Sequence, residues 1–169
     1  MKYLSLSLLS ISLLLTSSQC DKEVVSTYGH LKLAVTYPEV VHEADTFYYV
    51  PTPGVGAEVR LYDKEAVCLG YKDAMLNLVK IGGQYSTSMY LLVSNEKGEV
   101  LFTDIPIGEY YLIVFARQLS KYTEKYIEVN GGDTLKLVKN FTPDLTYWEN
   151  LEPWDHEVPG YKSTLFSSK

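Results

Sequence analysis

The chain has 169 residues, a formal net charge of −6 and 46% hydrophobic residues, which is the composition of a folded globular protein rather than a disordered one. An acidic chain without clustered Lys and Arg lacks the surface that neutralises phosphates, so the composition excludes nucleic acid as a partner. Tyrosine is unusually frequent, with 15 copies, and this favours β-strands with amphipathic surfaces.

The first residues have the charge and order of an export signal. Lys2 precedes an apolar run over residues 4–15, and small and polar residues follow as far as Gln19. The run is too short to cross a bilayer of about 30 Å as a helix, so it predicts a secretory signal peptide over residues 1–19. Cys20 stands where cleavage is expected.

This arrangement resembles a bacterial lipoprotein signal peptide, with Gln19 in place of the usual small residue before Cys20. The resemblance implies acylation of Cys20 by palmitate-type chains, and each buried CH₂ of such a chain contributes about 0.8 kcal/mol of membrane binding. The alternative is an ordinary signal peptide that happens to be followed by a cysteine. Under the lipoprotein interpretation, residues 20–29 form an acylated tether.

The residues behind the cysteine are Asp21, Lys22 and Glu23. Acidic residues at this place resemble the surface-export signal of Bacteroidetes lipoproteins. The resemblance implies an outer-membrane lipoprotein exposed at the cell surface, and a periplasmic orientation stays open.

In chain order, the first half predicts two strands and a short helix. Alternating apolar residues predict a strand over 30–37 that Pro38 stops. Residues 38–55 are expected to be a loop with a short strand at 47–50, and residues 56–63 a second strand. Helical spacing of apolar residues predicts a helix near 71–79 that ends at Gly82-Gly83.

The second half is a series of strands and turns. Residues 85–94 are rich in strand-forming types, and Asn95 to Gly98 is a turn, after which Val100 and Phe102 point inward. Residues 109–116 are apolar on both faces, which predicts a central strand covered on both sides. Strands are also expected at 122–129 and 134–141, joined by a hairpin turn over 130–133.

About seven strands and little helix predict one all-β domain over residues 30–141, an antiparallel Ig-like sandwich. The most specific motif links a turn, an inward pair, a Pro-x-Gly corner and a strand opening with Tyr. Its residues are Asn95, Gly98, Val100, Phe102, Ile105, Pro106, Gly108, Tyr110 and Leu112, and Gly56-Ala57, Val59 and Leu61-Tyr62 begin a strand upstream. Together they resemble the prealbumin-like sandwich of carboxypeptidase regulatory-like and Cna-B-like domains, over residues 29–141.

That resemblance implies a fold more than a function, because such modules serve as spacers, adhesin stalks and accessory domains. Some Cna-B-like domains form a Lys–Asn crosslink assisted by a buried acid. Lys32 and Asn140 lie in suitable first and last strands, but Val114 occupies the assisting position. The resemblance therefore implies no crosslink here.

The sequence offers no recognisable catalytic or metal-binding pattern. His30, His42 and His156 show no metal-ligand spacing, so neither a metal nor a cofactor is expected. Cys68 lies in an apolar stretch and is interpreted as a small buried residue rather than a reactive thiol. The chain is therefore predicted not to be an enzyme.

Residues 142–169 form an aromatic C-terminal tail that contains both tryptophans. One interpretation is that the tail packs back on the sandwich and covers an edge of a sheet. The other is that it docks a partner. The candidate partner- or ligand-binding residues in it are Tyr147, Trp148, Trp154 and Tyr161.

Two functions follow as hypotheses. The first is a non-catalytic, lipid-anchored envelope protein that is an accessory or structural module of a larger outer-membrane or surface assembly. The second is a surface lipoprotein that binds a glycan or another ligand, since aromatic side chains also stack on sugars. The partners expected are the membrane, through Cys20, and a larger envelope protein, with a glycan as the alternative.

Overall fold

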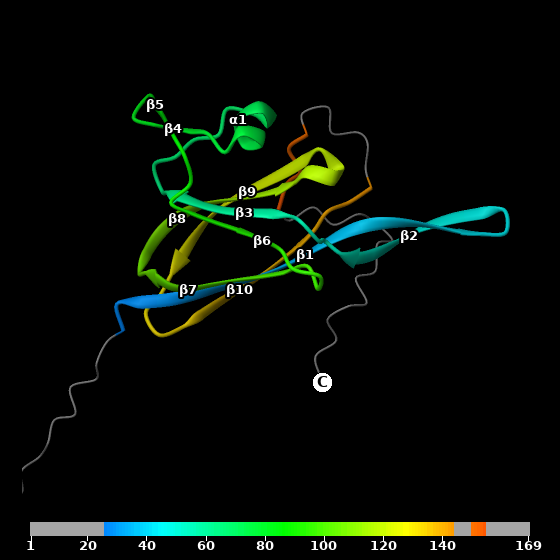
Figure 1. The fold of residues 1–169 in the computed structure, drawn as a ribbon, viewed down its shortest axis with the longest axis horizontal. Helices are drawn as coiled ribbons and strands as arrows, with labels where there is room; N and C mark the ends of the chain where they lie inside the picture. Colours follow the sequence, from blue (N-terminus) through cyan, green and yellow to red (C-terminus); the bar gives the residue numbers. More distant parts are fainter. Residues whose placement is uncertain (1–25, 144–149, 155–169) are drawn as a thin grey trace, which may run out of the picture.

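The computed structural model describes residues 26–143 and 150–154, and these form two facing β-sheets (Figure 1). Ten strands, one short α-helix and one turn of 3₁₀ helix are present in this part of the chain. Their bounds are β1 Tyr28–Glu43, β2 Thr46–Pro53, β3 Glu58–Asp63, α1 Tyr71–Leu76, β4 Val79–Ile81, β5 Gln84–Ser86, β6 Tyr90–Val93, β7 Glu99–Pro106, β8 Gly108–Ala116, η1 Arg117–Leu119, β9 Lys121–Val129 and β10 Thr134–Asn140.

The first sheet is built around β1, which pairs with β10 on one side and with β7 and then β2 on the other. The second sheet has the order β6-β3-β8-β9, and all of its pairs are antiparallel. The sandwich expected from the sequence is therefore confirmed. One pair departs from the antiparallel rule, because β1 and β10 run parallel over seven residue pairs, from His30↔Thr134 to Thr36↔Asn140.

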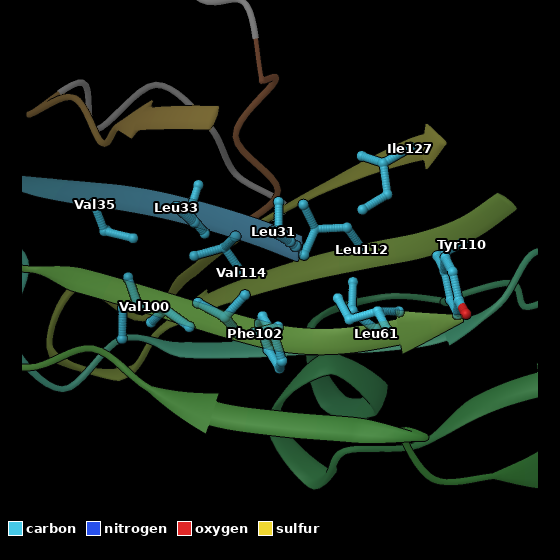
Figure 2. Packing of buried hydrophobic residues seen from close by; sticks show 14 of the residues in the cluster. Leu31, Leu33, Val35, Leu61, Val100, Phe102, Tyr110, Leu112, Val114 and Ile127 are labelled. Carbon is cyan, nitrogen blue, oxygen red and sulfur yellow. The ribbon is translucent and has the colours of Figure 1, made fainter. Parts of the chain in front are cut away.

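The main core lies between the two sheets, where alternate residues of each strand point inward (Figure 2). The motif behind the family resemblance supplies much of it, since Val100, Phe102 and Leu112 are all buried. The Asn95 side chain holds the preceding turn by accepting hydrogen bonds from the Lys97 and Glu99 amides, at 2.9 and 3.0 Å. Gly98 is required in that turn, because its φ is +72° and an added Cβ would lie 2.4 Å from the Val35 carbonyl oxygen.

A second core covers the outer face of the β6-β3-β8-β9 sheet. Tyr111, Ile113 and Phe115 of β8 are buried there beneath the insertion that carries α1 and the β4-β5 hairpin. Strand β8 thus has apolar contacts on both faces, as its sequence predicts. The helix is shorter than expected, because Asn77 adopts a left-handed conformation and ends it. Gly82 and Gly83 instead form the β4-β5 turn.

Two sequence-based expectations about turns are wrong. Residues 130–133 do not close a hairpin, since β9 and β10 belong to different sheets and the connection crosses the sandwich. Its backbone is held by β1 instead, with the His30 amide donating to the Asp133 carbonyl at 2.9 Å and the Gly132 amide to the Tyr28 carbonyl at 2.9 Å. Pairing of β10 with β1 over seven residue pairs therefore takes the place of a local hairpin between β9 and β10.

Pro38 does not stop the first strand, which continues to Glu43 and forms a hairpin with β2. At Pro38 the neighbour is Pro51 of β2, while β10 on the other side ends opposite Thr36. The Phe141 amide donates to the Thr36 carbonyl, so the backbone N–H and C=O of Thr36 point toward the β10 side of β1. Pro38, two residues further along the strand, points to the same side, where β10 has already ended. The missing N–H of Pro38 therefore removes no hydrogen bond between strands. The segment predicted as a loop is therefore a long strand pair.

Candidate binding surfaces

The β1-β2 hairpin extends beyond the rest of the sandwich, and among the described residues no third strand pairs with its outer part (Figure 1). We call residues 39–50 the arm. Nearly every side chain in it is exposed, including Val40, Phe47, Tyr48 and Tyr49. Large apolar side chains left in water on a projecting element are characteristic of a surface that contacts another molecule.

The arm carries its aromatic rings in contact with one another. The Phe47 ring lies 6.4 Å from the His42 ring and 6.1 Å from the Tyr49 ring, centroid to centroid. Across the hairpin, Val40 is opposite Tyr49 and His42 is opposite Phe47. The expectation of a loop over residues 38–55 missed this surface, and the signal for it was the run Phe47-Tyr48-Tyr49-Val50.

A second feature is a buried cluster of charges that fixes the described end of the tail. The Glu152 carboxylate is fully buried and accepts from Lys139 Nζ at 2.8 Å and from Lys121 Nζ at 3.0 Å. The Thr142 amide donates to both of its oxygens, at 3.1 and 3.2 Å. Lys139 also donates to the Pro153 carbonyl at 2.9 Å. We call Lys121, Lys139 and Glu152 the clasp.

The clasp holds residues 150–154 against the open edge of β9. The Tyr122 amide donates to the Asn150 carbonyl at 2.9 Å, and the Glu152 amide to the Tyr122 carbonyl at 2.8 Å, which forms a parallel bridge. Trp154 packs against the main core, with Lys125 Nζ 5.5 Å from its ring centroid. This part of the tail covers an edge, which was one of the two interpretations of the tail.

The other predicted site residues fall outside the described part of the chain. They are Cys20, Asp21, Lys22, Glu23, Tyr147, Trp148 and Tyr161. The crosslink residues are described and do not meet: Lys32 pairs with Glu99 at 2.8 Å, while Asn140 accepts from the Thr36 hydroxyl at 2.8 Å. Val114 is buried in the core.

Sequence reasoning missed the clasp, although the pattern contained a signal. Leu135, Leu137 and Phe141 alternate inward, and Lys139 occupies the same phase of β10. A lysine at an inward position predicts a buried countercharge, because an unpaired buried charge is too costly to keep. Its partner, Glu152, could not be named in advance because it lies beyond the last strand.

A further buried charge supports the insertion rather than a ligand. Arg60 donates to the Ala74 carbonyl and pairs with Glu58, which also accepts from Arg117 at 2.8 Å. Partial burial would raise the pKa of Glu58, but the hydrogen bonds from Arg117 and Arg60 lower it below its usual value. Arg60 therefore ties α1 to β3.

Cys68 lies under the same insertion and is half-buried. Burial raises the pKa of its thiol above the usual value, which keeps it protonated. Its Sγ lies 3.4 Å from the Gly70 carbonyl oxygen. This placement agrees with a packing role for Cys68.

An open depression of about 520 Å³ lies beside Tyr126 on the outer side of β9. Lys64, Glu65, Glu109 and Glu128 line it, and Lys64 pairs with Glu109 at 2.9 Å. The Tyr126 ring is 62% exposed and rests against Tyr111, with the ring centroids 5.1 Å apart. An exposed ring with flanking carboxylates can stack on a sugar and accept from its hydroxyl groups.

Within residues 26–143 and 150–154, no group of three or more His, Cys, Asp or Glu side chains is placed to hold a metal ion. No helix in this same part of the chain is long and apolar enough to cross a bilayer.

Comparison with known proteins gives structural similarities alone. No family model matches the sequence, and neither does any curated protein. Among solved structures, a minor pilin of Streptococcus agalactiae has a TM-score of 0.37 at 14% identity over 72% of this chain and 48% of its own. The major pilin subunit of Bacillus cereus has a TM-score of 0.34 at 20% identity, over 68% of this chain and 30% of its own.

A candidate carbohydrate-binding protein of Pseudomonas aeruginosa has a TM-score of 0.36 at 14% identity, over 70% of this chain and 92% of its own. This chain spans less than half the length of the two pilins. The sandwich architecture is defined by the two sheets themselves, and similarities at this level assign no activity.

Proposed function

We propose that the protein is a non-catalytic, lipid-anchored envelope protein that serves as an accessory module of a larger outer-membrane or surface assembly. The observation that carries this proposal is the arm, in which Phe47 is 65% exposed and Tyr48 is 46% exposed beyond the body of the sandwich. Apolar surface of this kind is stabilised when a partner covers it.

The position of the arm suits a protein anchored at its N-terminus. Cys20 lies a few residues before Ser26, and β1 begins at Tyr28, at the end of the molecule opposite the arm (Figure 1). A strand of 16 residues rises about 3.3 Å per residue, so the arm tip lies roughly 50 Å from the start of β1. An anchored protein would present the arm to partners away from its own membrane.

A non-catalytic role is supported by how the buried charges are used. Glu152 is neutralised by Lys139 and Lys121, and Arg60 is bonded to Glu58 and the backbone of α1. These groups hold elements together, and the side chains of Glu152 and Lys139 are closed to a substrate because they are 0% exposed.

The test of the anchor is detergent-phase partitioning of the full chain, expressed with its signal peptide, beside the Cys20→Ser variant. The wild-type protein is expected in the detergent phase with an acylated N-terminal peptide by mass spectrometry. The variant is expected in the aqueous phase. Wild-type protein in the aqueous phase with a free cysteine would contradict the proposal. Cys68→Ser is the matched control and should partition as the wild type does.

A second candidate function is glycan binding, which the exposed Tyr126 ring and its carboxylate-lined depression favour. Titration of the full chain with a panel of neutral oligosaccharides tests it. Saturable binding that Tyr126→Ala removes and Tyr85→Ala retains would support this function. Tyr85 is a fair control because its ring is also exposed, at 58%, and contacts Lys80.

A further inference from the structure

The arm has two chemically different faces. Cross-strand partners and alternate residues of a strand share a face, so Val40, His42, Phe47 and Tyr49 lie together on what we call the aromatic face. The opposite face, called the acidic face, carries Glu39, Val41, Glu43, Thr46, Tyr48 and Val50. Asp45 lies in the turn at the tip.

The aromatic face is exposed to solvent over its whole length. Val40 is 46% exposed, Phe47 is 65% exposed and Tyr49 is 37% exposed, so the contacts among the rings bury only part of them. A two-stranded hairpin without a covering layer has marginal stability in water. Covering this face would therefore both bury apolar area and order the arm.

Charge decides which kind of partner fits. The acidic face and tip place Glu39, Glu43 and Asp45 within one short hairpin, and the whole chain carries a net charge of −6. Bringing two arms together would bring two chains of net charge −6 into contact, which disfavours a second copy as the occupant. Cationic side chains beside an apolar floor would complement both faces.

Location disfavours the anchoring membrane as the occupant if Cys20 is acylated. The arm tip lies at the end of β1 remote from Tyr28, so it points away from the lipid that the anchor would enter. The occupant is then a protein that meets the domain at its far end.

We infer that the arm is a docking element that inserts its aromatic face into an apolar groove of a partner protein whose rim carries Lys or Arg side chains. This inference rests on the proposed function and names the surface that performs it. Phe47 and Tyr49 are the anchors in the groove floor, and Glu39 and Glu43 pair with the rim.

The experiment is site-specific photo-crosslinking in the cells that make the protein, using the full chain with a benzophenone amino acid at position 47, 49 or 85. Position 85 is the control, because Tyr85 is 58% exposed but lies in the β4-β5 hairpin, outside both the arm and the depression beside Tyr126. We expect one discrete adduct from positions 47 and 49 and none from 85. Peptide mapping should place the adduct in an apolar segment flanked by Lys or Arg.

Charge reversal then tests the rim. Glu39→Lys with Glu43→Lys should lower the yield of the adduct roughly tenfold. Glu96→Lys with Asp133→Lys is the matched control, since both residues are exposed and lie far from the arm along the chain, and it should leave the yield unchanged. If Glu39→Lys with Glu43→Lys leaves the adduct yield unchanged, the inference of Lys or Arg side chains on the rim of the groove is wrong.

The separate outcomes distinguish this inference from the proposed function. An adduct with a second copy, with residues 155–169 of the same chain or with lipid overturns the inference. If positions 47 and 49 give no adduct while a stoichiometric partner still co-purifies, the arm is not the docking element but the accessory role stands. If no partner is found by either route, both fail.

Folding is checked with Phe47→Ser combined with Tyr49→Ser. Because both side chains are exposed, the melting temperature of the purified variant should match that of the wild type. The benzophenone amino acid is placed for this test at position 40, which is also on the aromatic face, and its adduct with the partner should be lost in the variant. A variant that keeps the adduct contradicts the role of the two anchors.

Discussion

The carboxylate of Glu152 is buried and forms ion pairs with two lysines. Its side chain is 0% exposed, as is that of Lys139, and Lys121 is 12% exposed. Desolvating three charges is costly, and the cost is offset by short ion pairs and by the Thr142 amide, which uses the remaining lone pairs. The cluster therefore depends on every member being present.

Glu152→Gln is expected to lower the free energy of unfolding by about 3–5 kcal/mol, because it removes the buried negative charge that pairs with both Lys139 and Lys121. Urea denaturation of the full chain measures this. Glu128→Gln, at an exposed position of β9, is the control and should change stability by less than about 0.5 kcal/mol. A loss below about 1 kcal/mol for Glu152→Gln would show that the cluster is open to water.

Tyr37 carries a hydroxyl that is buried and has no hydrogen-bond partner among the described residues. Burial, reinforced by the nearby charge of Glu58, raises its pKa from 10.0 to about 12. The folded state therefore holds the proton more tightly than the unfolded state does. This contribution to stability is complete below pH 10 and is lost as the pH rises toward 12.

Tyr37→Phe should consequently reduce the loss of stability between pH 10 and 12 and should cost little at pH 7, since it removes a hydroxyl that nothing satisfies. Urea denaturation at a series of pH values measures both effects. An unchanged alkaline slope would mean that Tyr37 ionises normally in the folded protein. Tyr126→Phe, at an exposed ring, is the comparison variant.

At the scale of elements, the described end of the tail adds one isolated parallel bridge to the edge of the β6-β3-β8-β9 sheet. Its bridge to Tyr122 covers the start of β9, an edge that would otherwise be open to pairing with another chain. Trp154 then closes over the main core beside Lys125. Residues 150–154 thus both cover the edge of β9 and pack against the main core.

Trp154→Ala should therefore destabilise the isolated protein by about 2 kcal/mol, less than a fully buried tryptophan because the ring is only partly buried. Thermal or urea unfolding measures it. The double serine variant of the arm provides the contrast, since it removes two aromatic rings that pack on nothing in the sandwich. Equal stability of Trp154→Ala and wild type would contradict the packing of this segment.

The pattern of apolar side chains predicted the strands well where a strand has neighbours on both sides, as β8 does. It was misleading where a strand leaves the body. Pro38 and the polar residues around it indicated a loop, yet β1 and β2 continue as a pair because no third strand requires the missing N–H. The turn residues at 130–133 led to an equally wrong prediction of a hairpin. The chain instead crosses to the other sheet there, because β10 pairs with β1.

For the whole molecule, the parallel pairing of the first and last strands sets which residues face one another. Lys32 is opposite Lys136, and Asn140 is opposite Thr36, so the residues considered for a crosslink are four positions apart in register. Lys32 is instead paired with Glu99 on the surface. The fold therefore relies on packing and buried ion pairs for its stability.

The intact mass of the purified protein is expected to show no loss of ammonia beyond what removal of the signal peptide and acylation explain. Lys32→Met should leave that mass otherwise unchanged and should alter stability by less than about 1 kcal/mol, because surface ion pairs contribute little. A mass lower by one ammonia that Lys32→Met restores would establish the crosslink and contradict this reading of the register.

The sequence by itself determined the all-β class, the central strand and the turn-and-corner motif, because these depend on the period of side chains along one strand and on the conformations that Gly and Pro allow. It also supplied the expectation of an acylated export signal at Cys20. Only the tertiary structure decided that β10 lies parallel to β1, that Glu152 meets Lys139, and that the arm stands free. Those features join residues far apart in the chain, and such pairings depend on how the two sheets pack rather than on any local pattern.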